Sequence, residues 1–190
     1  RYIRRDSGLV VGGGHNNLAT RQRILGIDPG SRVTGFGVID IVDRGPVYAA
    51  SGAIRTKTGD FPDRLRQIFL AVSEVVATYS PDIVAIENVF MARNAGSALK
   101  LGQARSAALC ATFSRDLEVF EYAPREVKLA VVGTGAATKE QVQHMILSLL
   151  KLAGEPDPDA ADALAIAVCH AHQRVTRAHV AASARLAGIQ

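Results

Sequence analysis

Three apolar stretches near the start of the chain have the length and the residue types of β-strands. They run over Ile24–Ile27, Thr34–Val42 and Pro46–Thr56. The residues between the last two stretches, Asp43-Arg44-Gly45, favour a compact turn. We therefore expect this part of the chain to fold as an antiparallel meander.

A helical pattern follows, opened by Thr58-Gly59-Asp60 and ended by Ser80-Pro81-Asp82. Its apolar residues recur at steps of three and four: Leu65, Ile68, Phe69, Val72, Val75, Val76 and Tyr79. The next run, Ile83–Ile86, is apolar throughout and predicts a fourth strand. Because a helix precedes this strand, we expect it to pair parallel to the strand at 24–27.

The remaining pattern is mainly helical, with one more strand. The predicted elements are helices at Ser97–Ser114, Pro124–Val131 and Asp159–Gln173, a helix opened by the capping-box pair Thr138 and Gln141, and a strand at Leu117–Tyr122. Together the elements predict an α/β fold, in which helices flank both faces of a five-stranded mixed sheet.

The chain length suits one domain with a single sizeable core, which we place at residues 24–174. Residues 1–20 lack sustained periodicity and the apolar core of a signal peptide. We expect them to be a disordered extension, an upstream start or a remnant of cloning. Residues 175–190 are basic and rich in alanine, and we expect a flexible tail there.

The net charge of +4 does not by itself indicate a nucleic-acid partner. It arises in the first 23 residues, and acidic and basic residues balance from Ile24 onward. The cysteines, Cys110 and Cys169, fit no metal-ligand spacing, and we expect both to be reduced core residues of a cytoplasmic protein. No apolar run is long enough to predict a transmembrane helix.

Two of the predicted strands end on an acid. Asp28 follows the first strand, and Glu87 follows the fourth. If these strands are parallel neighbours, both carboxylates lie at the carboxyl edge of the sheet, where sites of α/β proteins form. Asp28 could instead cap an Asp-Pro-Gly turn. The glycines that follow it could admit a phosphate backbone or pack the second strand.

Two further acids open the last predicted helix. Asp159 and Asp162 are three residues apart and therefore share a helical face. Asp159 could be only a helix N-cap, but that role does not extend to Asp162, which precedes an apolar helix. Four converging carboxylates suit Mg²⁺, and two such ions can promote phosphodiester hydrolysis. The sequence has no Walker-type phosphate-binding motif and no competing Cys/His set.

The order of the elements resembles the ribonuclease H-like fold. The motifs ILGIDPGSRVTGFGV, IENVFMARN, SALKLGQAR, EYAPREVKLAVVGTG and DAADALAIAVCHAH resemble the RuvC family of Holliday-junction resolvases. The resemblance spans about Ile24 to His172. It implies a structure-selective endodeoxyribonuclease of recombination and repair that makes paired symmetric nicks in four-way junctions.

The resemblance also implies a cofactor and partners. It assigns metal binding and catalysis to Asp28, Glu87, Asp159 and Asp162, with two Mg²⁺ ions per active site and Mn²⁺ as a substitute. It implies a homodimer that works with a branch-migration complex of the RuvA and RuvB type. The predicted helix Ser97–Ser114, with Leu99, Leu101 and Leu109, is our candidate interface, although its apolar residues could simply cover the sheet.

For DNA binding, the resemblance points to Phe90, Arg93, Lys128 and Lys139. Phe90 would stack beside an unpaired base, but it could equally anchor its loop. The lysines could be solvated surface residues. They belong, however, to a local excess of basic residues suited to phosphates, namely Arg93, Lys100, Arg105, Arg125, Lys128 and Lys139. We expect the histidines His144, His170 and His172 at helix surfaces.

Three other functions share parts of this pattern. A ribonuclease H-like enzyme acting on RNA would share the strand-end acids, but it would not require the FMARN and KLGQAR segments. An actin-like ATPase or sugar kinase would need a second nucleotide-binding half, for which this chain is too short. A non-catalytic junction-binding module would not require all four acids.

Overall fold

The computed structural model describes residues 21–42, 45–57, 59–88 and 94–186, with side chains described through Arg174. The expected N-terminal extension, the first two residues of the predicted 43–45 turn, and the candidate DNA contacts Phe90 and Arg93 lie outside the described residues. The division into an extension, one domain and a tail stays a prediction.

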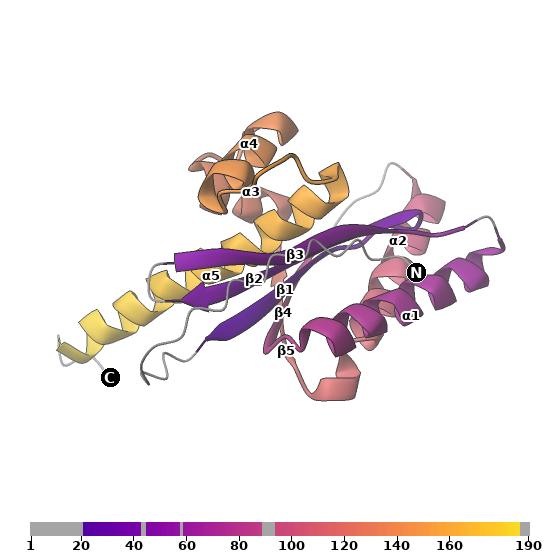
Figure 1. Cartoon of the computed structure of the whole chain (residues 1–190), viewed down its shortest axis with the longest axis horizontal. Helices are drawn as coiled ribbons and strands as arrows, with labels where there is room; N and C mark the ends of the chain where they lie inside the picture. Colours follow the sequence, from indigo (N-terminus) through magenta and orange to yellow (C-terminus); the bar gives the residue numbers. More distant parts are fainter. Residues whose placement is uncertain (1–20, 43–44, 58, 89–93, 187–190) are drawn as a thin grey trace.

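A five-stranded sheet forms the centre of the fold, in the order β3-β2-β1-β4-β5 (Figure 1). The strands are β1 (Gln22–Asp28), β2 (Val33–Val42), β3 (Gly45–Arg55), β4 (Ile83–Glu87) and β5 (Glu118–Tyr122). β2 pairs antiparallel with both β1 and β3, whereas β4 pairs parallel with both β1 and β5. The predicted meander and the predicted parallel pairing are both confirmed.

Helices cover both faces of this sheet, as predicted (Figure 1). They are α1 (Phe61–Tyr79), α2 (Ala95–Cys110), α3 (Pro124–Val132), α4 (Lys139–Leu149) and α5 (Pro158–Leu186), with a 3₁₀ turn, η1, at Phe113–Arg115. Within the described ranges, no helix combines the length and apolar character needed to cross a membrane.

Alternate residues of each strand face opposite cores. Leu25 and Ile27 of β1 pack in a cluster with α1 and α2, whereas Ile24 belongs to a cluster with α3, α4 and α5. The last helix is buried on nearly every side from Ala163 to Cys169. This burial explains its almost uninterrupted apolar sequence.

Two helix ends differ from the predictions. α2 ends at Cys110 rather than Ser114, because the N–H and the hydroxyl of Thr112 both donate to the Leu109 carbonyl and tighten the chain into a 3₁₀ turn. α5 continues beyond Gln173 to Leu186, through a sequence rich in the strong helix former alanine.

The prediction that both cysteines lie in the core is wrong for one of them. Cys110, the last residue of α2, is exposed. Cys169 is buried in α5, and this burial raises the pKa of its thiol to about 12.

Glycines of β1 and β2 let α5 lie directly against the sheet. A Cβ atom on Gly35 would stand 1.9 Å from the carbonyl oxygen of Asp159, and one on Gly26 would stand 2.1 Å from that of Ala163. Neither distance leaves room for a side chain. Of the two roles considered for the glycines after Asp28, packing of the second strand is therefore the one that Gly35 performs.

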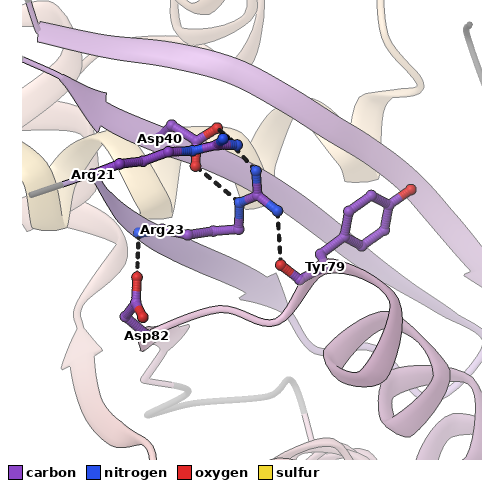
Figure 2. A network of polar contacts seen from close by, with 5 residues as sticks. All are labelled: Arg21, Arg23, Asp40, Tyr79 and Asp82. Carbon is purple, nitrogen blue, oxygen red and sulfur yellow. Dashed lines mark hydrogen bonds and ion pairs between the residues drawn. The ribbon is translucent and has the colours of Figure 1, made fainter. Parts of the chain in front are cut away.

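A polar network fixes the opposite end of β1 (Figure 2). The guanidinium of Arg23 donates from Nε to Asp40 Oδ1 at 2.8 Å and from Nη1 to the carbonyl oxygen of Tyr79 at 2.8 Å. The backbone N–H of Arg23 donates to Asp82 Oδ2 at 2.7 Å, and Arg21 also pairs with Asp40. Asp40 is buried, and the arginines compensate its charge. The network joins β1 and β2 to the end of α1 and the start of β4.

We predict that Gly35→Ala separates α5 from β2. The added methyl group would displace the helix backbone and reduce the free energy of unfolding by at least about 1–3 kcal/mol, the usual effect of overpacking. Urea denaturation measures this change. Gly102→Ala is the matched control, because a Cβ there meets nothing within 4 Å and alanine favours the helix. Equal stability of the two variants would contradict the close packing.

Candidate active site at the carboxyl ends of β1 and β4

The sheet delivers the first two acids to one edge. Asp28 is the last residue of β1, and Glu87 is the last residue of β4. The strands are parallel, and Ile27 pairs with Ile86, so the two acids occupy successive equivalent positions. The negative charges of Glu87, Asp162 and Asp159 all act on Asp28, which favours a shared site over a role limited to capping a turn.

The beginning of α5 delivers the other two acids. Asp159 lies in the first turn of this helix, and Asp162 follows one turn later. The cap role that we considered for Asp159 belongs to Asp157, whose Oδ1 accepts the backbone N–H of Asp159 at 3.1 Å. Arg55, at the end of β3, forms an ion pair with Asp157. The Asp159 carboxylate is thus not the helix cap.

Burial and mutual repulsion act on these acids together. Burial, the largest cause, and the negative charges of Glu87, Asp162 and Asp159 together raise the pKa of Asp28 to about 7. Burial and the charge of Asp162 raise the pKa of Glu87. Burial and the charge of Asp157 raise the pKa of Asp159. The four predicted acids are therefore close enough to act on one another electrostatically.

Two lysines supply the opposing charge. Lys139 Nζ lies 2.7 Å from Asp162 Oδ2, and this contact raises the pKa of the lysine. Lys139 begins α4 directly after Thr138, whose capping box with Gln141 is confirmed. Lys128 of α3 is near enough for its charge to oppose the rise in the pKa of Glu87. The structure thus brings both predicted lysines to the acids.

The four acids suit a hard divalent cation, because they offer carboxylate oxygens and the two lysines compensate their negative charge only in part. No three His, Cys, Asp or Glu side chains converge closely enough to hold an ion among the described residues. Side chains are described for residues 21–174, apart from gaps at 43–44, 58 and 89–93. The positive charge beside Asp162 is instead the ammonium group of Lys139.

The histidines lie differently from the prediction that all three are surface residues. His170 is buried, with its Nδ1 2.7 Å from the hydroxyl oxygen of Tyr122 and its ring packed on Phe120. His172 is half-buried, and its Nδ1 lies 3.0 Å from the Ala130 carbonyl oxygen. His144 is exposed, as predicted. The apolar run before His170 was the available signal of its burial.

The raised pKa of Asp28 predicts an unusual pH dependence. Between the ordinary pKa of 3.8 and the folded value of about 7, the folded state holds a proton that the unfolded state has released. The stability of the metal-free protein should therefore fall as the pH rises from about 4 to about 7. Asp28→Asn cannot ionise, and in EDTA at pH 8 its melting temperature should exceed that of the wild type by at least about 2–4 °C.

Melting curves from pH 4 to pH 8 in EDTA test this prediction. Asp63→Asn, which changes an exposed carboxylate of α1, should keep the wild-type decline. Parallel pH profiles for Asp28→Asn and the wild type would show that Asp28 does not titrate abnormally.

Comparison with known proteins places this arrangement in a family. The family model of the crossover junction endodeoxyribonuclease RuvC matches residues 24–170. A protein of that name from Photobacterium profundum is 61% identical over 153 residues, which cover 80% of this chain and 88% of the relative. The solved RuvC of Thermus thermophilus aligns with a TM-score of 0.74 at 34% identity, covering 82% of this chain and 96% of that one.

A second Thermus thermophilus RuvC structure, in complex with a Holliday junction substrate, aligns with a TM-score of 0.75 at 35% identity. The alignment covers 80% of this chain and 94% of that one. The family match, the sequence identity and the structural similarity each cover about four fifths of the chain or residues 24–170. This chain belongs to the RuvC family of crossover junction endodeoxyribonucleases.

Proposed function

We propose that this chain resolves four-way DNA junctions by paired symmetric nicks that depend on Mg²⁺, with Asp28, Glu87, Asp159 and Asp162 as the metal-binding acids. The observation that carries the proposal is their placement: Asp28 and Glu87 end the paired parallel strands β1 and β4, and the start of α5, which carries the two aspartates, packs against β2 at Gly35. The solved relative in complex with a Holliday junction supports the substrate.

The chemistry is the hydrolysis of a phosphodiester. When bound, divalent ions supply the charge that activates a water molecule and stabilises the leaving oxygen. A bond forms between the water oxygen and phosphorus, and the bond to the 3′ oxygen breaks, which leaves a 5′-phosphate and a 3′-hydroxyl. Asp28, Glu87, Asp159 and Asp162 would hold the ions, and Lys139 and Lys128 would add positive charge for the anionic DNA backbone.

Phe90 and Arg93 complete the proposed DNA contacts. They lie in the segment between Glu87 and α2, outside the described residues. The family motif that includes them supports stacking of Phe90 beside an unpaired base and a phosphate contact for Arg93.

Symmetric cutting requires two sites related by a two-fold axis, and a homodimer provides them. The structure supports α2 as the interface. Ala104 and Ala108 face inward and are fully buried, whereas 64% of Leu99 remains exposed. α2 thus covers the sheet and still presents an apolar side chain outward. We also propose a cytoplasmic location and joint action with a RuvA- and RuvB-type branch-migration complex.

Cleavage of a mobile synthetic four-way junction in Mg²⁺ tests this function. The wild type should cut it at symmetric positions, and Asp28→Asn should bind it but cut at least about 100-fold more slowly, because one metal ligand is lost. The proposal fails if the wild type binds the junction but cuts it no faster than this variant. Preferential cutting of RNA would support the ribonuclease alternative, and ATP turnover without DNA would support the kinase-like one.

Lys139→Ala should slow junction cleavage by about 10-fold or more, because it removes the positive charge nearest Asp162. The cleavage rate is measured at saturating DNA across a series of salt concentrations. Lys151→Ala, which removes an exposed lysine after α4, is the control. An unchanged rate for Lys139→Ala at every salt concentration would make this residue an ordinary surface lysine.

A further inference from the structure

One arginine of α2 points inward, to the end of the strand that carries Glu87. Arg105 Nε donates to the backbone carbonyl oxygen of Glu87 at 3.2 Å. Nη2 of the same guanidinium lies 2.8 Å from Glu121 Oε1 on β5. Only 18% of the Arg105 side chain is exposed, against 46% for Glu121. One guanidinium therefore joins α2, β4 and β5.

A second contact holds the same strand end from the other side. The backbone N–H of Asn88 donates to the carbonyl oxygen of Tyr122 at 2.8 Å, and Glu87 pairs with Tyr122 in the register of β4 and β5. The peptide group that follows the Glu87 Cα atom is thus tied to β5 through the N–H of Asn88 and to α2 through the carbonyl oxygen of Glu87. These contacts fix the position of the Glu87 backbone, from which its carboxylate reaches the edge of the sheet.

The position of Arg105 disagrees with a role in phosphate binding. From the sequence it belongs to a local excess of basic residues suited to the DNA backbone. In the structure its guanidinium is turned inward: Nε donates a hydrogen bond to the Glu87 carbonyl oxygen, and Nη2 lies within ion-pair distance of Glu121 without forming a hydrogen bond. Placing a cation away from solvent is costly unless it is paired, so these contacts account for its position.

We propose that Arg105 is a positioning residue for Glu87, which holds the strand end so that the Glu87 carboxylate stays directed at the other acids. Glu121 in turn orients the guanidinium. The inference rests on the proposed function, because the placement of Glu87 matters to cleavage only if Glu87 binds the metal. The need for an anchor is physical, since the negative charge of Asp162 repels the Glu87 carboxylate.

The test compares Arg105→Ala with Arg66→Ala, which removes an exposed arginine of α1. Three quantities are measured: the cleavage rate at saturating junction, the Kd for the junction in EDTA, and Mg²⁺ binding to the DNA-free protein by calorimetry. Arg105→Ala should slow cleavage by about 10–100-fold, as expected for a misplaced catalytic group. It should also weaken Mg²⁺ binding several-fold and change the junction Kd by less than about 3-fold, with Arg66→Ala unchanged in all three.

Two further variants separate positioning from general stability. Arg105→Lys should restore part of the cleavage rate, because an ammonium group replaces the charge but cannot bridge both oxygens as the fork does. Glu121→Gln should slow cleavage by about 2–3-fold, and adding it to Arg105→Ala should slow cleavage no further, since the two residues act as a unit.

If Arg105→Ala does not fold, the single variants Arg105→Lys and Glu121→Gln decide. Slower cleavage in both supports the inference, and wild-type rates in both overturn it.

Other results overturn the inference directly. Wild-type cleavage and wild-type Mg²⁺ binding in folded Arg105→Ala would show that Glu87 needs no such anchor. A junction Kd that rises by the same factor as the rate falls would make Arg105 a DNA contact. If the wild-type protein does not cut junctions at all, the proposed function fails, and Mg²⁺ binding by Arg105→Ala still decides whether the arginine places Glu87.

Discussion

Carboxylates that share a partly dehydrated site repel one another, and each is stabilised by taking up a proton or by moving apart. Here β1, β4 and α5 bring four such groups within electrostatic range, and the pKa of Asp28 rises to about 7 as a result of burial and this repulsion. The free energy to keep them together comes from packing elsewhere in the fold. The carboxylates whose repulsion destabilises the fold are thus also the groups that can bind a cation.

Several contacts resist that repulsion at the level of the main chain. The absence of a side chain at Gly35 lets the first turn of α5 lie against β2. Asp157 caps this helix and is held by Arg55 of β3. At the far end of β1, the network around Arg23 and Asp40 fixes the strand to α1 and β4. The acids are therefore carried on anchored backbone, so that their side chains can move toward a cation without rearrangement of the fold.

The sequence predicted the parts of the site that depend on local patterns. Asp28 and Glu87 were identifiable because each ends an apolar strand, and Asp162 because it precedes a buried helix. The antiparallel meander, the parallel pairing of β1 with β4 and the capping box at Thr138 followed from the same rules. The family resemblance added Lys139, which forms an ion pair with Asp162, and Lys128, whose charge acts on Glu87.

What the sequence did not predict depends on contacts between distant segments. The ion pair of Asp157 with Arg55 and the inward direction of Arg105 require knowledge of what β3 and β5 place nearby. His170 differs from an exposed helical histidine only through Tyr122 and Phe120, which belong to another element. No local pattern encodes such pairs, because the same residues on an isolated helix or strand would be solvated.

Thermal denaturation of the DNA-free protein with and without Mg²⁺ at pH 8 tests most directly whether the four acids form one cation site. A cation that binds only the folded state raises its stability by mass action and relieves the repulsion between the acids. Mg²⁺ should therefore raise the melting temperature of the wild type and have little effect on Asp159→Asn, which lacks one of the acids. An unchanged melting temperature in the wild type, or an equal rise in both proteins, would contradict the account.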